Sequence, residues 1–187
     1  YIPSPEEMPG RKTKEGKELT CKTTDPASAL IFKTSIEEHL GEISFMKLYA
    51  GEIVEAMDMI NSANGSKERV SQLFAVAGKK REKLEKACAG DIVATIKLKN
   101  VRTNHTLNSP KNSGDEIVPI EFPAPKITMA IRAKNTADDE KLGVALTEIQ
   151  KVDPTISVEY SKELKQIIMR GQGELHLNIA KWIIEHL

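Results

Sequence analysis

The residues best suited to chemistry lie in one turn near the C-terminus, Arg170-Gly171-Gln172-Gly173-Glu174-Leu175-His176. A Gly-x-Gly turn that opens a helix can bind an anion, because the first backbone N–H groups of a helix have no partner inside it. This turn has neither the third glycine of a dinucleotide fingerprint nor the Lys-Ser/Thr pair of a P-loop. The stronger interpretation is a structural turn that packs a helix onto a sheet.

No group of residues elsewhere has catalytic or metal-binding spacing. Asp138 and Asp139 are adjacent carboxylates, but they lie at a predicted helix start, where the helix dipole favours acidic side chains. Cys21 and Cys88 stand alone, without a Cys-x-x-Cys pair, so neither a zinc site nor a disulfide framework is indicated. We therefore predict no catalytic residue, metal ligand or cofactor site within this chain.

Composition limits the possible partners. The chain has 187 residues, which suits one large domain or two small ones, and its formal net charge is zero. A neutral chain is not typical of a free-standing nucleic-acid binder, so any RNA contact requires a local basic patch. No apolar run approaches the ~20 residues that span a bilayer, so we predict no membrane partner. The first residues lack a signal-peptide core, and because the chain starts at Tyr1 we expect it to belong to a longer protein.

The elements that position the turn follow from apolar periodicity. The strand Ile167–Met169 precedes it, and a helix running to Leu187 follows it. One helical face should be buried on the sheet, and its members are Leu175, Ile179, Trp182, Ile183 and Leu187. Upstream, residues 122–187 read as β-α-β-β-α, with a strand at 126–132 and a helix that begins at Thr136. This order lacks the last strand of a ferredoxin-like unit, so we expect one unpaired sheet edge.

The first two thirds of the chain have a different pattern. Residues 1–29 carry prolines and polar residues, and we predict an extended linker that leads into the first barrel segment. Residues 30–121 contain short strands separated by turn residues, which predicts an antiparallel β-barrel. The predicted strands are 30–34, 43–49, 52–54, 58–61, 69–74 and 91–98. Residues 79–88 are rich in Lys and Glu and favour a helix.

The sequence resembles the elongation factor G family over nearly its whole length. Gly171-Gln-Gly-Glu-Leu-His-Leu-Asn-Ile179 is similar to the family's Gly-Met-Gly-Glu-Leu-His-Leu-Glu-Ile in its third domain. Asp153-Pro-Thr155 and Pro123-Ala-Pro125 match that domain too. Lys67-Glu-Arg-Val70, Phe45 through Gly51, and Arg81-Glu82 followed by Ala89-Gly-Asp91 resemble its second, barrel domain. The implied fold is a translation-factor barrel followed by a ferredoxin-like α/β sandwich without its last strand.

Several positions depart from the family pattern. Lys47 replaces an arginine, and an arginine can bind phosphate with two hydrogen bonds where lysine acts as a point charge. Glu37-Glu-His-Leu40 replaces Asp-Pro-Tyr-Val, and Asn104-His105 replaces Gly-Asp. These differences are typical of a divergent member of the family.

The resemblance implies a function for the whole protein. A GTPase domain upstream would bind GTP and Mg²⁺, and the intact protein would promote movement of tRNA and mRNA on the ribosome. The chain itself would not be an enzyme; it would act as a monomer in the cytoplasm. Its partners would be its own GTPase domain, ribosomal RNA and small-subunit protein. Candidate interdomain or ribosome contacts are Arg170, Gln172, Glu174 and His176, and candidate rRNA contacts are Lys47, Lys67, Arg69, Lys79, Lys80, Arg81 and Lys83.

Two alternatives stay open at this point. A related ribosomal GTPase that protects the ribosome from tetracycline or recycles it would carry the same motifs. A binding module or small-molecule enzyme could also reuse a barrel and a ferredoxin-like unit, since fold does not determine function. An upstream P-loop would exclude the second alternative.

Overall fold

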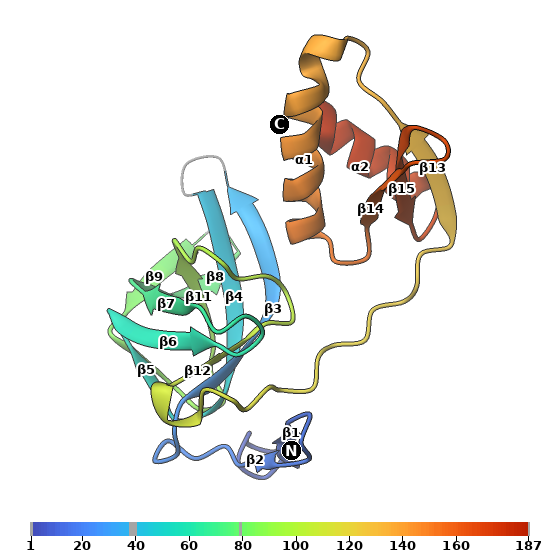
Figure 1. The fold of residues 1–187 in the computed structure, drawn as a ribbon. Coiled ribbons are helices and arrows are strands. Elements are labelled where there is room, and N and C mark those ends of the chain that lie inside the picture. The colour runs from blue at the N-terminus through green and yellow to red at the C-terminus, as the bar shows by residue number, and fades with distance from the viewer. Residues whose placement is uncertain (1, 38–40, 79, 187) are drawn as a thin grey trace. The chain divides into compact units, whose positions relative to one another are not determined.

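A computed structural model describes residues 2–37, 41–78 and 80–186 (Figure 1). Lys79, residues 38–40 and Leu187 lie outside the described residues, so the predictions that fall on them have no structural counterpart. The chain divides into two compact units, Tyr1–Ile120 and Glu121–Leu187. Each unit has a hydrophobic core of its own.

Unit 1 is built from antiparallel strands, as the sequence predicts. Its larger sheet has the order β7-β6-β12-β3-β4-β11-β8-β9, and β5 pairs with β10 in a small second sheet. The strands of these two sheets are β3 (Ser28–Glu37), β4 (Gly41–Ala50), β5 (Glu52–Val54), β6 (Met57–Asn61), β7 (Lys67–Val70), β8 (Leu73–Ala77), β9 (Lys80–Leu84), β10 (Lys86–Cys88), β11 (Ile92–Ile96) and β12 (Thr106–Asn108). A single 3-10 turn, Pro110–Asn112, follows β12.

The period of two along these strands creates an inner and an outer face. Inward side chains such as Ile31, Met46 and Leu48 are fully buried in the barrel core. Their neighbours in sequence point outward, and some of them form a second apolar layer on the outside of the sheet. Burial of one aliphatic side chain contributes about 1.5–3 kcal/mol, so the alternation itself fixes the register of each strand.

Two predictions within the barrel were wrong. Residues 80–88 form strands β9 and β10 instead of a helix. Their strong helix formers are overridden because this segment pairs with β8 and β5, and Leu84 and Ala87 pack against the barrel core from the two strands. The predicted strand 69–74 is two strands, β7 and β8, separated at Ser71-Gln72.

The N-terminal residues include two very short strands, β1 (Arg11–Lys12) and β2 (Glu18–Leu19). They pair with each other, and Thr13 forms a β-bridge to Ile117. Leu19 is buried with Leu30 and Ile117. This part of the chain is therefore attached to the outside of the barrel.

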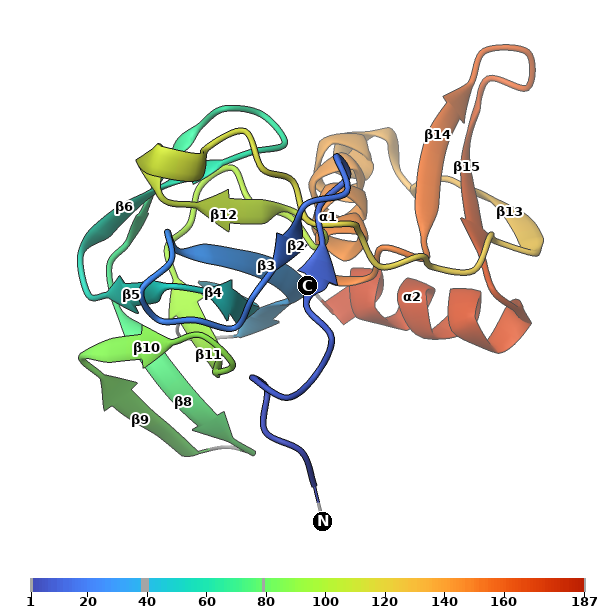
Figure 2. The ribbon, with the colours of Figure 1, turned by 90° about the horizontal axis from the view of Figure 1, so that it is seen from below.

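Unit 2 has the predicted order β-α-β-β-α. Its elements are β13 (Ile127–Ile131), α1 (Asp139–Val152), β14 (Ser157–Ser161), β15 (Gln166–Gly171) and α2 (Glu174–His186). The sheet order is β13-β15-β14, and both helices pack on one face of it (Figures 1 and 2). Within the described residues β13 pairs only with β15, which leaves its other edge open. The helix predicted from Thr136 begins with a 3-10 turn at Thr136–Asp138, and α1 proper starts at Asp139.

The prediction for the buried face of the last helix was wrong. Leu177 and Ala180 are the buried residues of α2, with Ile184 packed beside them. The predicted face is the exposed one: Leu175 is 74% exposed and Trp182 60%. The helix carries two apolar stripes, and the sheet covers the narrower one.

None of the described helices is both long and apolar enough to cross a membrane.

Candidate functional sites

The Gly171–Gly173 turn joins β15 to α2, and Gly171 is required there by close packing. A Cβ atom at this position would lie 2.6 Å from Leu177 Cδ2 and 3.0 Å from His176 Nδ1. Leu177 is fully buried in the core of unit 2 and has little room to move. The glycine therefore lets the helix start directly against the strand.

His176 holds this turn closed. Its Nδ1 accepts a hydrogen bond from the backbone N–H of Gln172 at 3.0 Å, and its Nε2 donates to Asp153 Oδ2 at 2.8 Å. These partners define the neutral tautomer that carries its proton on Nε2. The side chain is 23% exposed, so most of it faces the protein. His176 thus ties the turn to the end of α1.

Asp153 is held in turn by Thr155. The carboxylate accepts hydrogen bonds from the Thr155 backbone N–H at 2.8 Å and from its hydroxyl at 2.6 Å, both at Oδ1. Burial alone would raise the pKa of Asp153, but the hydrogen bonds from Thr155 and His176 outweigh it and hold the pKa below its ordinary value. The acid therefore stays ionised as an acceptor for His176.

The other three predicted residues of the turn have different surroundings. The Gln172 side-chain amide donates to the Pro123 carbonyl at 2.8 Å. Arg170 pairs with Glu159 across the exposed surface of the sheet at 2.5 Å. Glu174 is exposed in the first turn of α2. Among the four, the structure leaves Glu174 most open to a partner.

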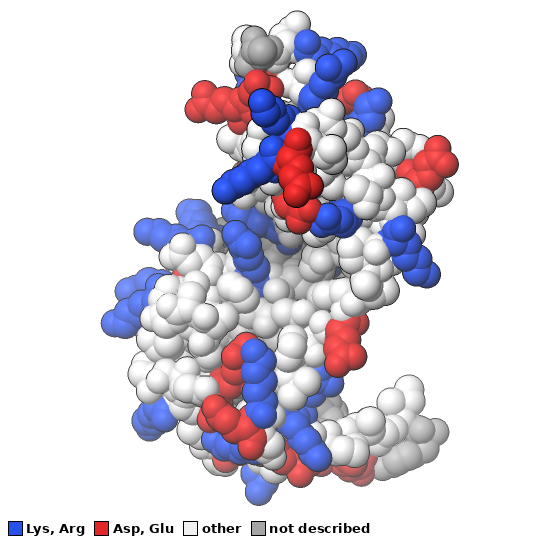
Figure 3. Space-filling model, turned by 45° about the vertical axis from the view of Figure 1, so that its right-hand side comes forward, with Lys and Arg blue, Asp and Glu red and all other residues white. Residues whose placement is uncertain are grey.

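The predicted cations of unit 1 that the structure describes lie on three different surfaces. Lys67 and Arg69 project from β7, each with a nitrogen 3.9 Å from an Asp58 carboxylate oxygen. Lys47, Arg81 and Lys83 belong to the outer face of the β4, β8, β9 and β11 strands. Lys80 is exposed on β9 but alternates to the opposite face. In the lower half of Figure 3, acidic and basic side chains lie close together over the barrel.

Most of these cations already have partners. Arg81 pairs with Glu37, and Lys83 lies 2.8 Å from Glu55. Lys47 Nζ sits 5.4 Å from the centroid of the Tyr49 ring. Such exposed pairs contribute about 0–1 kcal/mol, so they can be exchanged for a phosphate without a large loss.

Glu68 is a structural residue that sequence reasoning missed. It is 2% exposed and accepts hydrogen bonds from the backbone N–H groups of Lys99 at 2.9 Å and Asn100 at 3.0 Å. The Ser66 hydroxyl also donates a hydrogen bond to the Glu68 carboxylate, at 3.0 Å. The signal was available in the sequence, since a glutamate between outward-facing Lys67 and Arg69 must point inward in a strand.

Asn104 and His105, two departures from the family pattern, have structural roles. Asn104 has a φ of 73°, a conformation that glycine and asparagine tolerate best. Its side chain accepts from the Ile120 N–H at 2.8 Å and donates to the Ile120 carbonyl at 2.9 Å. His105 Nδ1 lies 2.9 Å from Asn61 Nδ2 and accepts from the Arg102 N–H at 3.2 Å. Burial, aided by the charge of Arg102, lowers the pKa of His105.

Comparison with known proteins identifies both units. The family model for domain 2 of elongation factor G matches residues 26–110, and the model for domain III matches residues 122–186. The chain belongs to the elongation factor G family. The resemblance found in the sequence motifs is confirmed, and units 1 and 2 are domains II and III of that family.

Relatives within the elongation factor G family align over nearly the whole chain. Elongation factor G 1 of Synechocystis sp. is 38% identical over 193 residues, which cover 99% of this chain and 27% of that protein. Elongation factor G 1 of Syntrophomonas wolfei is 38% identical over 185 residues, covering 96% and 27%. A solved structure from Thermus thermophilus has a TM-score of 0.73 and 25% identity over 86% of this chain and 24% of its own. The chain therefore spans about a quarter of the length of its relatives.

Proposed function

We propose that this chain forms the ribosome-binding barrel and the switch-relay domain of a GTP-dependent elongation factor that moves tRNA and mRNA through the ribosome. The observation that carries this proposal is the match to domains II and III in the right order, with relatives named elongation factor G. In the intact protein, GTP and Mg²⁺ belong to a separate GTPase domain. The proposed role of this chain is to bind and to transmit.

The turn at residues 170–176 is the proposed contact with the GTPase domain. Its backbone is held from inside by His176 and Asp153, so its shape does not depend on a partner. Glu174 and Gln172 stand at its surface. A rigid surface of this kind passes a small displacement in one domain to the next without absorbing it.

The barrel is the proposed contact with ribosomal RNA and small-subunit protein. Its exposed cations are arranged as point charges on a rigid sheet, which suits phosphate contacts that carry no sequence readout. Monomeric action in the cytoplasm is part of the same proposal.

The test uses the whole protein that contains this chain. Glu174→Lys combined with Gln172→Ala should lower ribosome-stimulated GTP hydrolysis and mRNA movement on pre-translocation ribosomes by about tenfold, the effect of losing one contact worth about 1.4 kcal/mol. Lys162→Glu, at the far end of the β14–β15 hairpin, is the matched control and should leave both rates unchanged. Equal rates for the double variant and the wild type would refute the relay role.

The same assays separate this proposal from a ribosome-protection or ribosome-recycling paralogue. Such a protein would bind ribosomes and hydrolyse GTP but would not advance mRNA. Asn104 gives no support to that alternative, because its φ of 73° is a conformation that glycine also adopts freely.

A further inference from the structure

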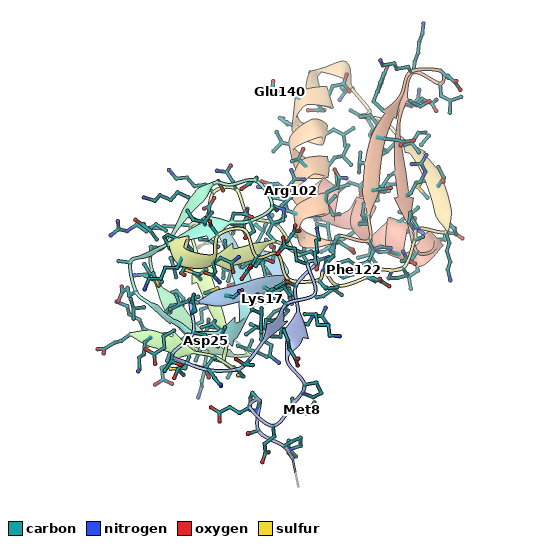
Figure 4. The ribbon with its side chains drawn as sticks, turned by 60° about the horizontal axis from the view of Figure 1, so that its bottom comes forward. Met8, Lys17, Asp25, Arg102, Phe122 and Glu140 are labelled. Atoms are coloured by element: carbon teal, nitrogen blue, oxygen red, sulfur yellow. The ribbon has the colours of Figure 1, made fainter. Side chains whose placement is uncertain are left out.

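Three of the four phenylalanines meet on one outer face of the barrel. Phe32 and Phe45 have ring centroids 6.4 Å apart, and Phe74 packs against the same outer apolar cluster as Phe45. Phe122, the fourth, lies in the segment that leads to β13 (Figure 4). In a chain with 4% aromatic residues, such a gathering on one surface needs an explanation.

The strand register explains how the rings come together. Phe45 on β4 lies opposite Ala94 on β11, and Ala94 lies opposite Phe74 on β8, so the two rings share one face. The pairing of β3 with β4 shifts between Ile31 and Lys33. This β-bulge inserts Phe32 as an extra residue and allows it to reach the ring of Phe45.

A buried apolar base supports these rings from below. Ile43, Ala94 and Ile96 are each no more than 6% exposed, although they point away from the barrel core. Phe45 and Phe74 cover them and remain half-buried themselves. The face therefore offers ring surface on a firm support, and we call it the aromatic face.

Cations surround the aromatic face. Lys33 Nζ lies 5.6 Å from the Phe45 centroid, and Lys47 is opposite Ile92, which is 59% exposed. Arg81 lies across from Val76, and Lys83 lies across from Phe74. Arg81 and Lys83 pair with Glu37 and Glu55. In the part of the chain that the structure describes, no ion pair is found for Lys33 or Lys47, whose contacts are with rings.

We propose that the aromatic face binds single-stranded RNA, with bases stacked on Phe32 and Phe74 and phosphates held by Lys33, Lys47, Arg81 and Lys83. Stacking is tolerant of sequence because every base has a π-face, and lysines around it track the backbone. A protein partner fits less well, because protein interfaces are depleted in lysine. The inference rests on the proposed function and deepens it by naming where unpaired ribosomal RNA would be held.

The first test measures binding of this chain to a fluorescein-labelled oligouridylate of about 12 nucleotides by anisotropy. The double variant Phe32→Leu/Phe74→Leu keeps the apolar layer but removes the rings, and it should bind at least about fivefold more weakly, since one stack is worth about 1 kcal/mol or more. Thermal unfolding verifies that the variant is folded. Unchanged affinity in a folded variant would overturn the proposal.

A second pair of variants avoids the apolar layer altogether. Lys33→Gln/Lys47→Gln should reduce the slope of log affinity against log salt by about 1.4, or about 0.7 for each lost phosphate contact. Lys162→Gln/Lys165→Gln is the matched control, because it removes two exposed cations from the β14–β15 turn of unit 2, outside the barrel. If both pairs of variants lowered this slope equally, the lysines would act only through general charge attraction, and the proposal would be contradicted.

Binding to small ribosomal subunits distinguishes failure of the aromatic-face proposal from failure of the proposed function. If the chain binds subunits and the Leu variant binds them equally well, the aromatic face is not the RNA site and the proposed function stands. If the Leu variant loses subunit binding while the wild type does not bind oligouridylate, the face contacts ribosomal protein and the RNA proposal is overturned. If the wild-type chain binds neither subunits nor oligouridylate, ribosome binding by this barrel fails as well.

Discussion

Removal of the Glu68 carboxylate should strongly destabilise the barrel. Glu68→Ala removes a buried carboxylate and leaves the backbone N–H groups of Lys99 and Asn100 without their acceptor. Each lost hydrogen bond to a charged group is worth about 1.5–3 kcal/mol, so the loss of two should lower the free energy of unfolding by about 3–6 kcal/mol. Glu68→Gln retains one acceptor oxygen and should lose about half of that.

The sequence supplies an internal control for this measurement. The chain has one tryptophan, Trp182, and it lies in unit 2. Urea unfolding followed by far-ultraviolet circular dichroism reports both units, whereas tryptophan fluorescence reports unit 2. Glu68→Ala should shift the dichroism transition of the barrel and leave the fluorescence transition in place. Glu82→Gln, an exposed change on β9, should stay within about 0.5 kcal/mol.

Two results would refute this reasoning. A loss below about 1 kcal/mol for Glu68→Ala would mean that water reaches the two N–H groups. An equal shift of the tryptophan transition would mean that the two units unfold as one, and the effect could not be assigned to the barrel.

Three further predictions follow from the geometry. Burial lowers the folded-state pKa of His105, so the unfolded barrel binds more protons than the folded one, and the free energy of unfolding should fall as the pH drops below about 6.5. His105→Gln should flatten this pH dependence. Urea titrations followed by circular dichroism measure it. Gly171→Ala should destabilise unit 2 by about 1–3 kcal/mol, because the added Cβ would overlap Leu177. Gly143→Ala has nothing within 4 Å of the added Cβ and should stabilise α1 by up to about 1 kcal/mol. Tryptophan fluorescence during urea unfolding measures both effects. Asp153→Asn and His176→Ala should show a coupling of at least about 0.5 kcal/mol in a double-mutant cycle, and strict additivity would contradict the contact between them.

Alternation of apolar and polar residues made most of the barrel predictable. The strand 52–54 was located with its exact bounds, and β3, β4, β6 and β11 to within a few residues. The hairpin at residues 80–88 was missed because its burial signal rests on Leu84 and Ala87 alone, among Lys and Glu residues that favour a helix. Pairing with β8 and β5, which are distant in sequence from parts of this segment, decided its conformation together with the packing of these two side chains.

The face of α2 shows a different limit. Leu177, Ala180 and Ile184 recur with the same helical spacing as the wider stripe that begins at Leu175, so periodicity alone could not choose between them. The sheet selects the stripe with the small Ala180, which allows close approach. Prediction of the candidate contact residues met the same limit, because the sequence identifies charged residues but not the carboxylates that pair with them in the fold.

The hydrogen bond from Gln172 to Pro123 shortens the free segment of chain between the two units. Asn104 holds Ile120 on the barrel side, and Gln172 holds Pro123 on the other. With both in place, the free connector from residue 120 to residue 123 reaches about 10 Å; without the Gln172 bond it extends to Lys126, the next anchored residue, and reaches about 20 Å. A methionine at position 172, as in the family signature, has no N–H to donate. Glutamine at this position therefore adds one anchoring hydrogen bond to the chain segment that joins the two domains.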